Sequence, residues 1–205
     1  MSFSFLSRTV YKTKSKISGE IVVKEQFGRH ALHVGNMIQS GGIVKGIWKK
    51  PLRQDQGELS VSNCLILGLG GGTVVQLIKA QYPEAKIVGI EIDKEIVKIS
   101  KKYFGLNKVK DLKIINDDAI NWVKKYKGDK FDMIIVDLYI GGDFQKKAMS
   151  DKFLKKIKKL LSKEGIIIFN WLKNKDGDEL IKKLEKNFLH LDKLDTPTNL
   201  FLFAH

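Results

Sequence analysis

The feature of this sequence that most constrains its fold is a short apolar run that ends in a cluster of glycines, Cys64-Leu-Ile-Leu-Gly-Leu-Gly-Gly-Gly-Thr73. A helical pattern of apolar residues follows over 73–82, and a second apolar run over 86–91 ends in Glu91. A strand, a tight turn, a helix and a second strand that ends in an acid form the βαβ unit of nucleotide-binding sheets. The sequence therefore predicts an α/β fold with a doubly wound, mainly parallel sheet.

The residue types at this turn suit a nucleotide ligand. Gly68, Gly70 and Gly72 let the backbone turn sharply and let a ligand approach without meeting a Cβ atom. The helix that begins after Gly72 directs free N–H groups and the positive end of its dipole at that ligand. Glu91 follows at the tip of the next strand, where its carboxylate can accept hydrogen bonds from both ribose hydroxyls. The alternative is a glycine turn that serves only to pack a helix against a strand.

Two common nucleotide motifs do not fit the turn. Thr73 stands where the dinucleotide fingerprint has a glycine, and the Gly-Lys-Ser/Thr sequence of phosphate-binding loops is absent. The spacing Gly68-x-Gly70-x-Gly72 followed by Glu91 resembles the adenosyl-sulfonium site of class I methyltransferases and their relatives. NAD is the alternative ligand.

Composition narrows the class of protein further. A chain of 205 residues with 43% hydrophobic residues can form one ordinary domain with a small appendage. The single cysteine, Cys64, lies in the first predicted core strand, so no intrachain disulfide can form and a cytoplasmic location is expected. We expect neither a signal peptide nor a membrane partner, because no apolar run approaches the length of a membrane span.

The net charge of +14 raises nucleic acid as a partner. The excess is mostly lysine, and pairs such as Lys124-Lys125 and Lys155-Lys156 recur on the polar faces of predicted amphipathic helices. No zinc-finger spacing or RNA-binding aromatic motif accompanies them. We therefore interpret the charge as a solvated surface and predict no specific nucleic-acid partner.

The order of predicted elements divides the chain into two parts. Residues 1–57 are expected to form a small N-terminal β-hairpin domain and linker, and residues 58–205 a Rossmann-like domain with a seven-stranded sheet. In the first part, residues 1–19 are either a tail or an edge strand, strands follow at 20–25 and 29–34, and a short helix lies within 40–57. In the second part, strands are predicted at 63–68, 86–91, 112–116, 131–136 and 165–170 with a closing hairpin in 188–205, and helices at 73–82, 94–104, 118–126, 150–162 and 177–187.

Polar residues gather at the carboxyl ends of the predicted strands, where ligands bind in open α/β sheets. Successive strand ends carry Glu91 and Asp93, then Asp117 and Asp118, then Asp137 and Tyr139, and finally Asn170. A strongly basic chain thus places a row of carboxylates along one edge, which indicates a binding site. Asp117 or Asp118 can instead cap the helix that follows.

No pattern of residues predicts a metal site or a Ser/His/Asp or Cys/His centre. The four histidines, at positions 30, 33, 190 and 205, are scattered along the chain and share no metal-ligand spacing. We expect them on the surface or in packing contacts.

Several segments resemble the spermidine synthases, the polyamine aminopropyltransferases of polyamine biosynthesis. They are Gly68-x-Gly-Gly-Gly-Thr73, Val88-Gly-Ile-Glu-Ile-Asp93, Asp118-Ala119, Phe131-Asp-Met-Ile-Ile-Val-Asp137 and, in the N-terminal hairpin, Gly28-Arg-His-Ala-Leu32 with Gln39. The resemblance implies that Glu91 binds the ribose, Asp118 the adenine and Gln39 the donor. It also implies that Asp137 binds the acceptor amine and takes its proton. The co-substrate would be decarboxylated S-adenosylmethionine or S-adenosylmethionine, with no metal.

The chain departs from this family at several positions. Gly70 stands where the family has an aspartate in the glycine turn, and Ile140 stands in place of a second acid three residues after the catalytic one. Trp48 replaces a tyrosine. We take Trp48, Tyr139 and Asp143 as substrate-binding candidates, with Asp143 as a substitute for the missing second acid.

The interpretation is a spermidine-synthase-like transferase that moves an aminopropyl group from a decarboxylated S-adenosylmethionine-type donor to an amine such as putrescine. A small-molecule methyltransferase is the alternative, favoured by Gly70, because an aspartate there would repel the carboxylate of intact S-adenosylmethionine. A binding protein that keeps the fold without catalysis is a third interpretation. The acceptor, the donor's carboxylation state and the oligomeric state stay open, with a homodimer among the options.

Overall fold

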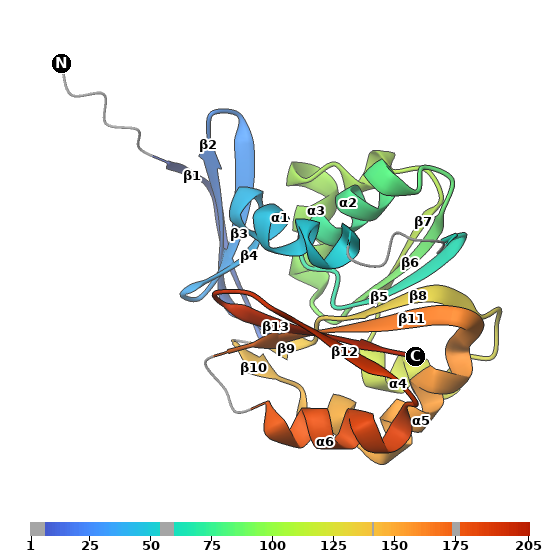
Figure 1. The fold of residues 1–205 in the computed structure, drawn as a ribbon. Helices are drawn as coiled ribbons and strands as arrows, with labels where there is room; N and C mark the ends of the chain where they lie inside the picture. Colours follow the sequence, from blue (N-terminus) through green and yellow to red (C-terminus); the bar gives the residue numbers. More distant parts are fainter. Residues whose placement is uncertain (1–6, 54–59, 141, 174–176) are drawn as a thin grey trace.

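A computed structural model describes residues 7–53, 60–140, 142–173 and 177–205. The chain forms a four-stranded antiparallel sheet at its N-terminal end, a seven-stranded mixed sheet with helices on both faces, and a two-stranded ribbon (Figure 1). The seven-stranded sheet has the strand order β12-β13-β11-β8-β5-β6-β7.

The N-terminal sheet consists of β1 (Arg8–Ser15), β2 (Gly19–Gln26), β3 (Arg29–Val34) and β4 (Met37–Ser40), paired in chain order. Alternate apolar residues of β2 and β3, among them Val23 and Leu32, pack against Ile96 and Ile99 of a helix in the larger unit. The two predicted strands are confirmed. The sheet is larger than the predicted hairpin, because the 1–19 region supplies an edge strand in which lysine alternates with threonine, a pattern with little apolar signal.

The segment after β4 folds as a helix, α1 (Gly42–Lys49), and a 3-10 turn, η1 (Pro51–Arg53). The short helix predicted within 40–57 is confirmed, although residues 54–57 lie outside the described residues. Trp48 of α1 is 1% exposed and packs edge-on to Phe201, with ring centroids 4.9 Å apart. The helix therefore belongs to the core of the seven-stranded sheet, and the boundary placed between residues 57 and 58 stays a prediction.

Six strands of the large sheet run in one direction, and β13 runs antiparallel to both of its neighbours. The seven strands are β5 (Asn63–Leu67), β6 (Lys86–Glu91), β7 (Leu112–Asn116), β8 (Phe131–Val136) and β11 (Leu161–Leu172), followed by β12 (Leu191–Asp195) and β13 (Asn199–Ala204). The chain builds outward from β5 to β6 and β7, then returns to β8 on the other side. The carboxyl end of β5 is therefore the switch point of the sheet, where such folds bind ligands.

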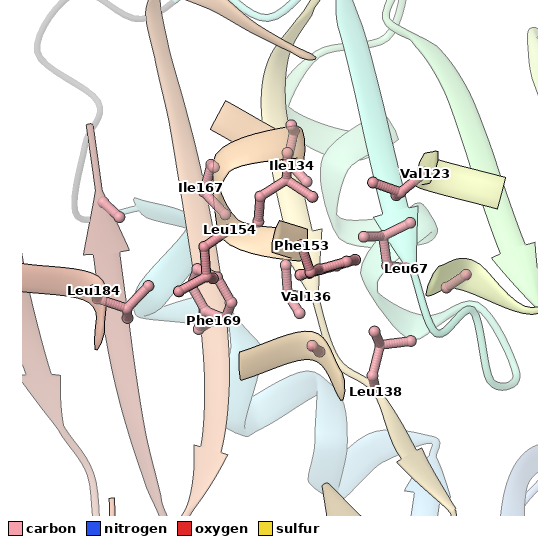
Figure 2. Close-up of a cluster of buried hydrophobic side chains, with 14 of the residues drawn as sticks. Leu67, Val123, Ile134, Val136, Leu138, Phe153, Leu154, Ile167, Phe169 and Leu184 are labelled. Atoms are coloured by element: carbon pink, nitrogen blue, oxygen red, sulfur yellow. The ribbon is translucent and has the colours of Figure 1, made fainter. Parts of the chain in front are cut away.

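Helices cover both faces of this sheet (Figure 1). The bounds are α2 (Thr73–Gln81), α3 (Lys94–Tyr103), η2 (Leu106–Lys108), α4 (Ala119–Lys125), η3 (Lys146–Met149), α5 (Asp151–Leu160) and α6 (Asp178–Asn187). Side chains of α4, α5 and α6 share one apolar cluster with the sheet, part of which Figure 2 shows around Phe153 and Phe169. Side chains of α1 and α2 share a second cluster on the opposite face. The predicted strands and helices of this unit are confirmed to within about two residues, except that β11 starts at Leu161, before the apolar run over 166–169 on which the prediction rested.

The ribbon of β9 (Tyr139–Ile140) and β10 (Asp143–Phe144) was not predicted. Its strands pair antiparallel around a turn that includes Gly142, at a φ of 88°. Two residues per strand are too few to produce an alternating pattern, so the glycines are the sequence signal that indicates a turn here. The ribbon follows β8 directly and so lies next to the switch point.

Gly68 allows the main chain to pack closely at the switch point. It adopts a φ of +90°, and a Cβ atom at this position would lie 2.1 Å from the main-chain oxygen of Asp137. Its N–H donates to the carbonyl of Ile90 at 3.0 Å, while the N–H of Asp137 donates to Leu67 at 2.9 Å. The end of β5 is thus held between β6 and β8 at a separation that only glycine permits.

We expect Gly68→Ala to lower the free energy of unfolding by roughly 3–5 kcal/mol, because backbone strain adds to a clash with main chain that cannot move aside. Gly105→Ala is the matched control: Gly105 has a φ of +71° but no atom within 4 Å of its Cβ position, so only strain applies. That control should lose about 1–2 kcal/mol. Chemical unfolding measures both, and equal losses would contradict the close approach.

Candidate active site

A cavity of about 980 Å³ opens at the carboxyl edge of the seven-stranded sheet, at the switch point. Its walls come from the turn after β5, the ends of β6, β8 and β11, the loop before β13, and from β4 and α1. This volume lies at the upper end of the range typical of small-molecule sites. One wall is therefore contributed by the N-terminal sheet.

The cavity brings together most of the predicted site residues. Its lining includes Gln39, Trp48, Gly68, Gly70, Glu91, Asp118, Asp137 and Tyr139. Gly72, Asp93, Asp117 and Asp143 lie outside this lining. Their predicted binding roles stay predictions. The contacts below show what Gly72, Asp93 and Asp117 do in the fold.

The glycine turn is tied to the N-terminal wall by hydroxyl groups. Ser40, which is 1% exposed, accepts a hydrogen bond from the N–H of Gly71 at 2.8 Å, and Thr73 accepts one from Gly41 at 3.1 Å. A Cβ atom on Gly72 would collide with Leu106, so this glycine serves helix packing. Sequence reasoning missed Ser40, because nothing local marks a serine in a short strand as a partner of a turn 31 residues away.

Glu91 is a buried carboxylate held by main chain. One oxygen, Oε2, accepts from the N–H of Gly70 at 2.9 Å, and Oε1 accepts from the N–H of Asp93 at 3.0 Å. Burial raises the pKa of Glu91, and these N–H groups oppose that rise. Because each carboxylate oxygen can accept more than one hydrogen bond, both oxygens retain capacity for a ligand's hydroxyl groups.

The three aspartates on neighbouring strand ends make different contacts. Asp93 caps α3, accepting from the N–H of Glu95 at 2.9 Å and from the hydroxyl of Ser15. Asp117 accepts from the N–H of Asp118 at 2.8 Å. Asp118 caps α4 through Oδ1 and also lines the cavity, so the residue predicted to bind the adenine is also the helix cap. Oδ2 of Asp118 accepts no hydrogen bond from the residues that the structure describes.

Asp137 lies at the end of β8, next to the glycine turn. The residue is half-buried and lines the cavity, and its Oδ1 accepts from Nδ2 of Asn170 at 2.9 Å. Burial raises the pKa of Asp137 to about 6, with the Asn170 hydrogen bond lowering it and the charge of Glu91 raising it further. An acid with a pKa just below neutrality is mostly ionised at pH 7 and can still hold a proton that it has accepted.

The aromatic residues of the cavity present apolar surface. The hydroxyl of Tyr139 accepts from the N–H of Leu172 at 2.8 Å and donates to the carbonyl of Asn170 at 3.1 Å, so it is engaged with main chain. Burial raises the pKa of Tyr139. Trp48 lines the apolar side of the cavity. The lining also carries Lys146 and Lys147, which sequence reasoning did not connect with the site.

Within the described ranges, no group of three or more histidine, cysteine, aspartate or glutamate side chains is arranged to hold a metal ion. None of the helices in that part of the chain is long and apolar enough to cross a membrane.

The sheet order and the glycine turn at its switch point define the class as a methyltransferase-like α/β fold. The model of the spermine/spermidine synthase domain matches residues 47–201. Because this match spans most of the chain, the protein belongs to the spermine/spermidine synthase family.

Similar proteins agree with this assignment. The chain is 31% identical over 186 residues to the polyamine aminopropyltransferase of Prochlorococcus marinus strain MIT 9312, covering 80% of this chain and 61% of that protein. It is 30% identical over 220 residues to the protein of the same name from strain MIT 9301, covering 97% of this chain and 70% of that protein. The chain thus spans about 61–70% of the length of these two relatives.

Solved structures show the same fold. A spermidine synthase in complex with the transition-state analogue AdoDATO has a TM-score of 0.78 at 16% identity, covering 96% of this chain and 73% of that one. A probable spermidine synthase from Corynebacterium glutamicum has a TM-score of 0.80 at 16% identity, covering 97% and 80%. Human methyltransferase-like protein 13 in complex with SAH has a TM-score of 0.63 at 22% identity, covering 79% of each chain.

The raised pKa of Asp137 predicts how stability depends on pH. An acid whose pKa rises from 3.8 to about 6 on folding destabilises the fold when ionised, so this effect is absent below about pH 4 and complete above about pH 6. We expect Asp137→Asn to exceed the parent in unfolding free energy by about 1–3 kcal/mol at pH 7.5, with the gap closing below pH 4. Urea unfolding at both pH values, with the exposed Asp129→Asn as control, measures this. A gap independent of pH would contradict the burial of the charge.

Proposed function

We propose that this protein is an aminopropyltransferase. It would move the aminopropyl group of decarboxylated S-adenosylmethionine to a small amine such as putrescine. The observation that carries the proposal is the position of Asp137, a half-buried carboxylate in the same cavity as the glycine turn and Glu91. Membership of the spermine/spermidine synthase family supports the reaction class.

The donor's nucleoside would occupy the side of the cavity formed by β5 and β6. Glu91 accepts hydrogen bonds from the two ribose hydroxyls, and Oδ2 of Asp118 accepts one from the adenine amino group. Gln39 contacts the donor from the opposite wall. Gly68 and Gly70 let the nucleoside approach the main chain without Cβ contacts. The solved structure of a spermidine synthase in complex with the transition-state analogue AdoDATO supports a donor that contains an adenosyl group.

The acceptor amine would be activated by Asp137. An alkylammonium has a pKa near 10 and holds its proton at neutral pH, so it has no free electron pair. Asp137 binds the ammonium, accepts one proton, and leaves the nitrogen pair directed at the carbon beside the sulfonium. The new C–N bond forms as the C–S bond breaks, and the sulfur leaves with both electrons as the neutral thioether methylthioadenosine. The protein contributes alignment and a proton acceptor.

A direct assay tests this proposal and its alternatives. The purified protein is incubated with putrescine and either decarboxylated or intact S-adenosylmethionine, and products are identified by mass spectrometry. We expect spermidine and methylthioadenosine from the decarboxylated donor alone. Methyl transfer from the intact donor would favour the methyltransferase alternative, which the glycine at position 70 also favours. Calorimetry that finds no binding of either donor or of methylthioadenosine would favour a non-catalytic protein.

Glu91→Gln tests the ribose site. Loss of a charge-assisted acceptor should weaken methylthioadenosine binding by about 1.5–3 kcal/mol in calorimetry. Glu84→Gln, whose side chain is 84% exposed, is the matched control and should bind normally. Since Glu91 also holds the glycine turn, thermal unfolding of the variant confirms that the fold persists. Unchanged affinity in a folded variant would remove the ribose assignment.

Asp137→Asn separates chemistry from binding. The amide keeps the shape and can still accept from Asn170, but it has no charge to hold an ammonium and cannot take its proton. We expect turnover to fall about a hundredfold or more, while nucleoside affinity changes by less than about 1 kcal/mol. Both quantities are measured on one sample, with Asp129→Asn as the control. Turnover within a few-fold of the parent would exclude Asp137 as the base.

A further inference from the structure

A chain of three hydrogen bonds leads from the rim of the cavity to Asp137. The hydroxyl of Thr198 donates to Oδ1 of Asn199 at 2.5 Å, and Nδ2 of Asn199 donates to Oδ1 of Asn170 at 2.7 Å. Nδ2 of Asn170 then donates to Oδ1 of Asp137 at 2.9 Å. Asn170 and Asn199 are 6% and 3% exposed, so water competes little for these bonds.

The direction of the chain is set by the chemistry of the amides. An asparagine side chain has a donor end and an acceptor end. Because Asn199 offers its NH₂ group to Asn170, Asn170 must turn its carbonyl oxygen to Asn199 and its NH₂ group to Asp137. Reversing either amide would set carbonyl against carbonyl, or carbonyl against carboxylate. The direction is fixed at the Asp137 end, because an ionised carboxylate can only accept, and the hydroxyl of Thr198 completes the chain by donating to Oδ1 of Asn199.

The main chain around these residues is also held. Asn199 opens β13 and pairs with Leu172 of β11, two residues beyond Asn170. Its N–H donates to the hydroxyl of Thr196 at 3.0 Å, and its carbonyl accepts from the N–H of Thr196 at 2.9 Å. The carbonyl of Asn170 accepts from the hydroxyl of Tyr139. Both amides are therefore fixed on rigid strand positions, which makes a directional chain physically meaningful.

We propose that Asn170 and Asn199 are positioning residues: they anchor Oδ1 of Asp137, leave Oδ2 for the acceptor amine, and stabilise the carboxylate form of the acid. Thr198 connects this chain to the 196–199 turn at the cavity rim. The proposal rests on the role proposed above for Asp137 and extends it to side chains that are hydrogen-bonded to the acid directly or through one another.

The groups around Asp137 show why a donor matters there. Glu91 faces it from β6 with the same charge, and Tyr139 faces it from β9 with an engaged, neutral hydroxyl. Asp118, Lys146, Lys147 and Lys173 line the wider cavity. Among the described residues, Asn170 is the side chain whose hydrogen bond favours the ionised acid. Without that donor, burial and Glu91 would act unopposed and raise the pKa of Asp137.

The experiment is a pH titration of the ligand-free, full-length protein labelled with ¹³C at aspartate carboxyl groups. The signal of Asp137 is identified by its loss in Asp137→Asn. We expect the midpoint to rise by about one pH unit in Asn170→Ala and by about half a unit in Asn199→Ala. Asn187→Ala is the matched control: this asparagine of α6 donates to the carboxylate of Asp151 at 3.3 Å, and its loss should leave Asp137 unchanged.

The Asn199 variant carries the argument, because Asn199 is linked to Asp137 through the side chain of Asn170. Should Asn199→Ala fail to fold, Thr198→Val keeps the shape of an exposed residue, releases the orientation of Asn199, and should shift the midpoint in the same direction by a smaller amount. Midpoints equal to the parent's in these variants would overturn the proposal. The titration requires no turnover. If the shifts are seen but no aminopropyl transfer is detected, the proposed function fails and the positioning role of the hydrogen-bond chain stands. Normal transfer with unmoved midpoints would keep the function and remove the positioning role of the two asparagines.

Discussion

The close approach of main chain at the end of β5 is the contact on which the rest of this structure depends. Gly68 brings the glycine turn against the backbone of Asp137, so that the ends of β6 and β8 lie on either side of one turn. This contact places Glu91 and Asp137 in one cavity although 45 residues separate them in the sequence. A side chain at position 68 would push β8 away and separate the two acids that define the site.

The site reverses the sign of charge that dominates the molecule. A chain with a net charge of +14 exposes its lysines on helix faces, while buried Glu91 and half-buried Asp137 line one cavity. Each acid is stabilised by short hydrogen bonds from uncharged donors, main-chain N–H groups for Glu91 and an amide for Asp137. Because no described cation pairs directly with either, both carboxylates stay available to a cationic ligand. The arrangement suits substrates that bring positive charge.

The parts of the structure that sequence reasoning predicted are those that local patterns specify. Apolar runs located the core strands, the glycines located the switch point, and strand ends located Glu91 and Asp137. For residues 1–19 the sequence left an edge strand and a tail as alternatives, because an edge strand needs no apolar face. The β9–β10 ribbon was missed because it is too short for a pattern. Ser40 and Asn199 escaped because their partners lie 31 and 29 residues away, at distances in sequence that no local pattern reports. The dual position of Asp118, as helix cap and cavity wall, likewise required the assembled sheet.

The N-terminal sheet forms one wall of the cavity, and hydroxyl-mediated hydrogen bonds through Ser40 and Thr73 fasten this side of the chain to the glycine turn. The two sides of the pocket are thus encoded by separate stretches of the gene. Substitutions in α1, which carries Trp48, can reshape one side of the cavity while the glycine turn and Glu91, held by β5 and β6, keep their geometry. A lineage carrying this fold can therefore alter the shape of one side of the cavity while the other side stays as it is.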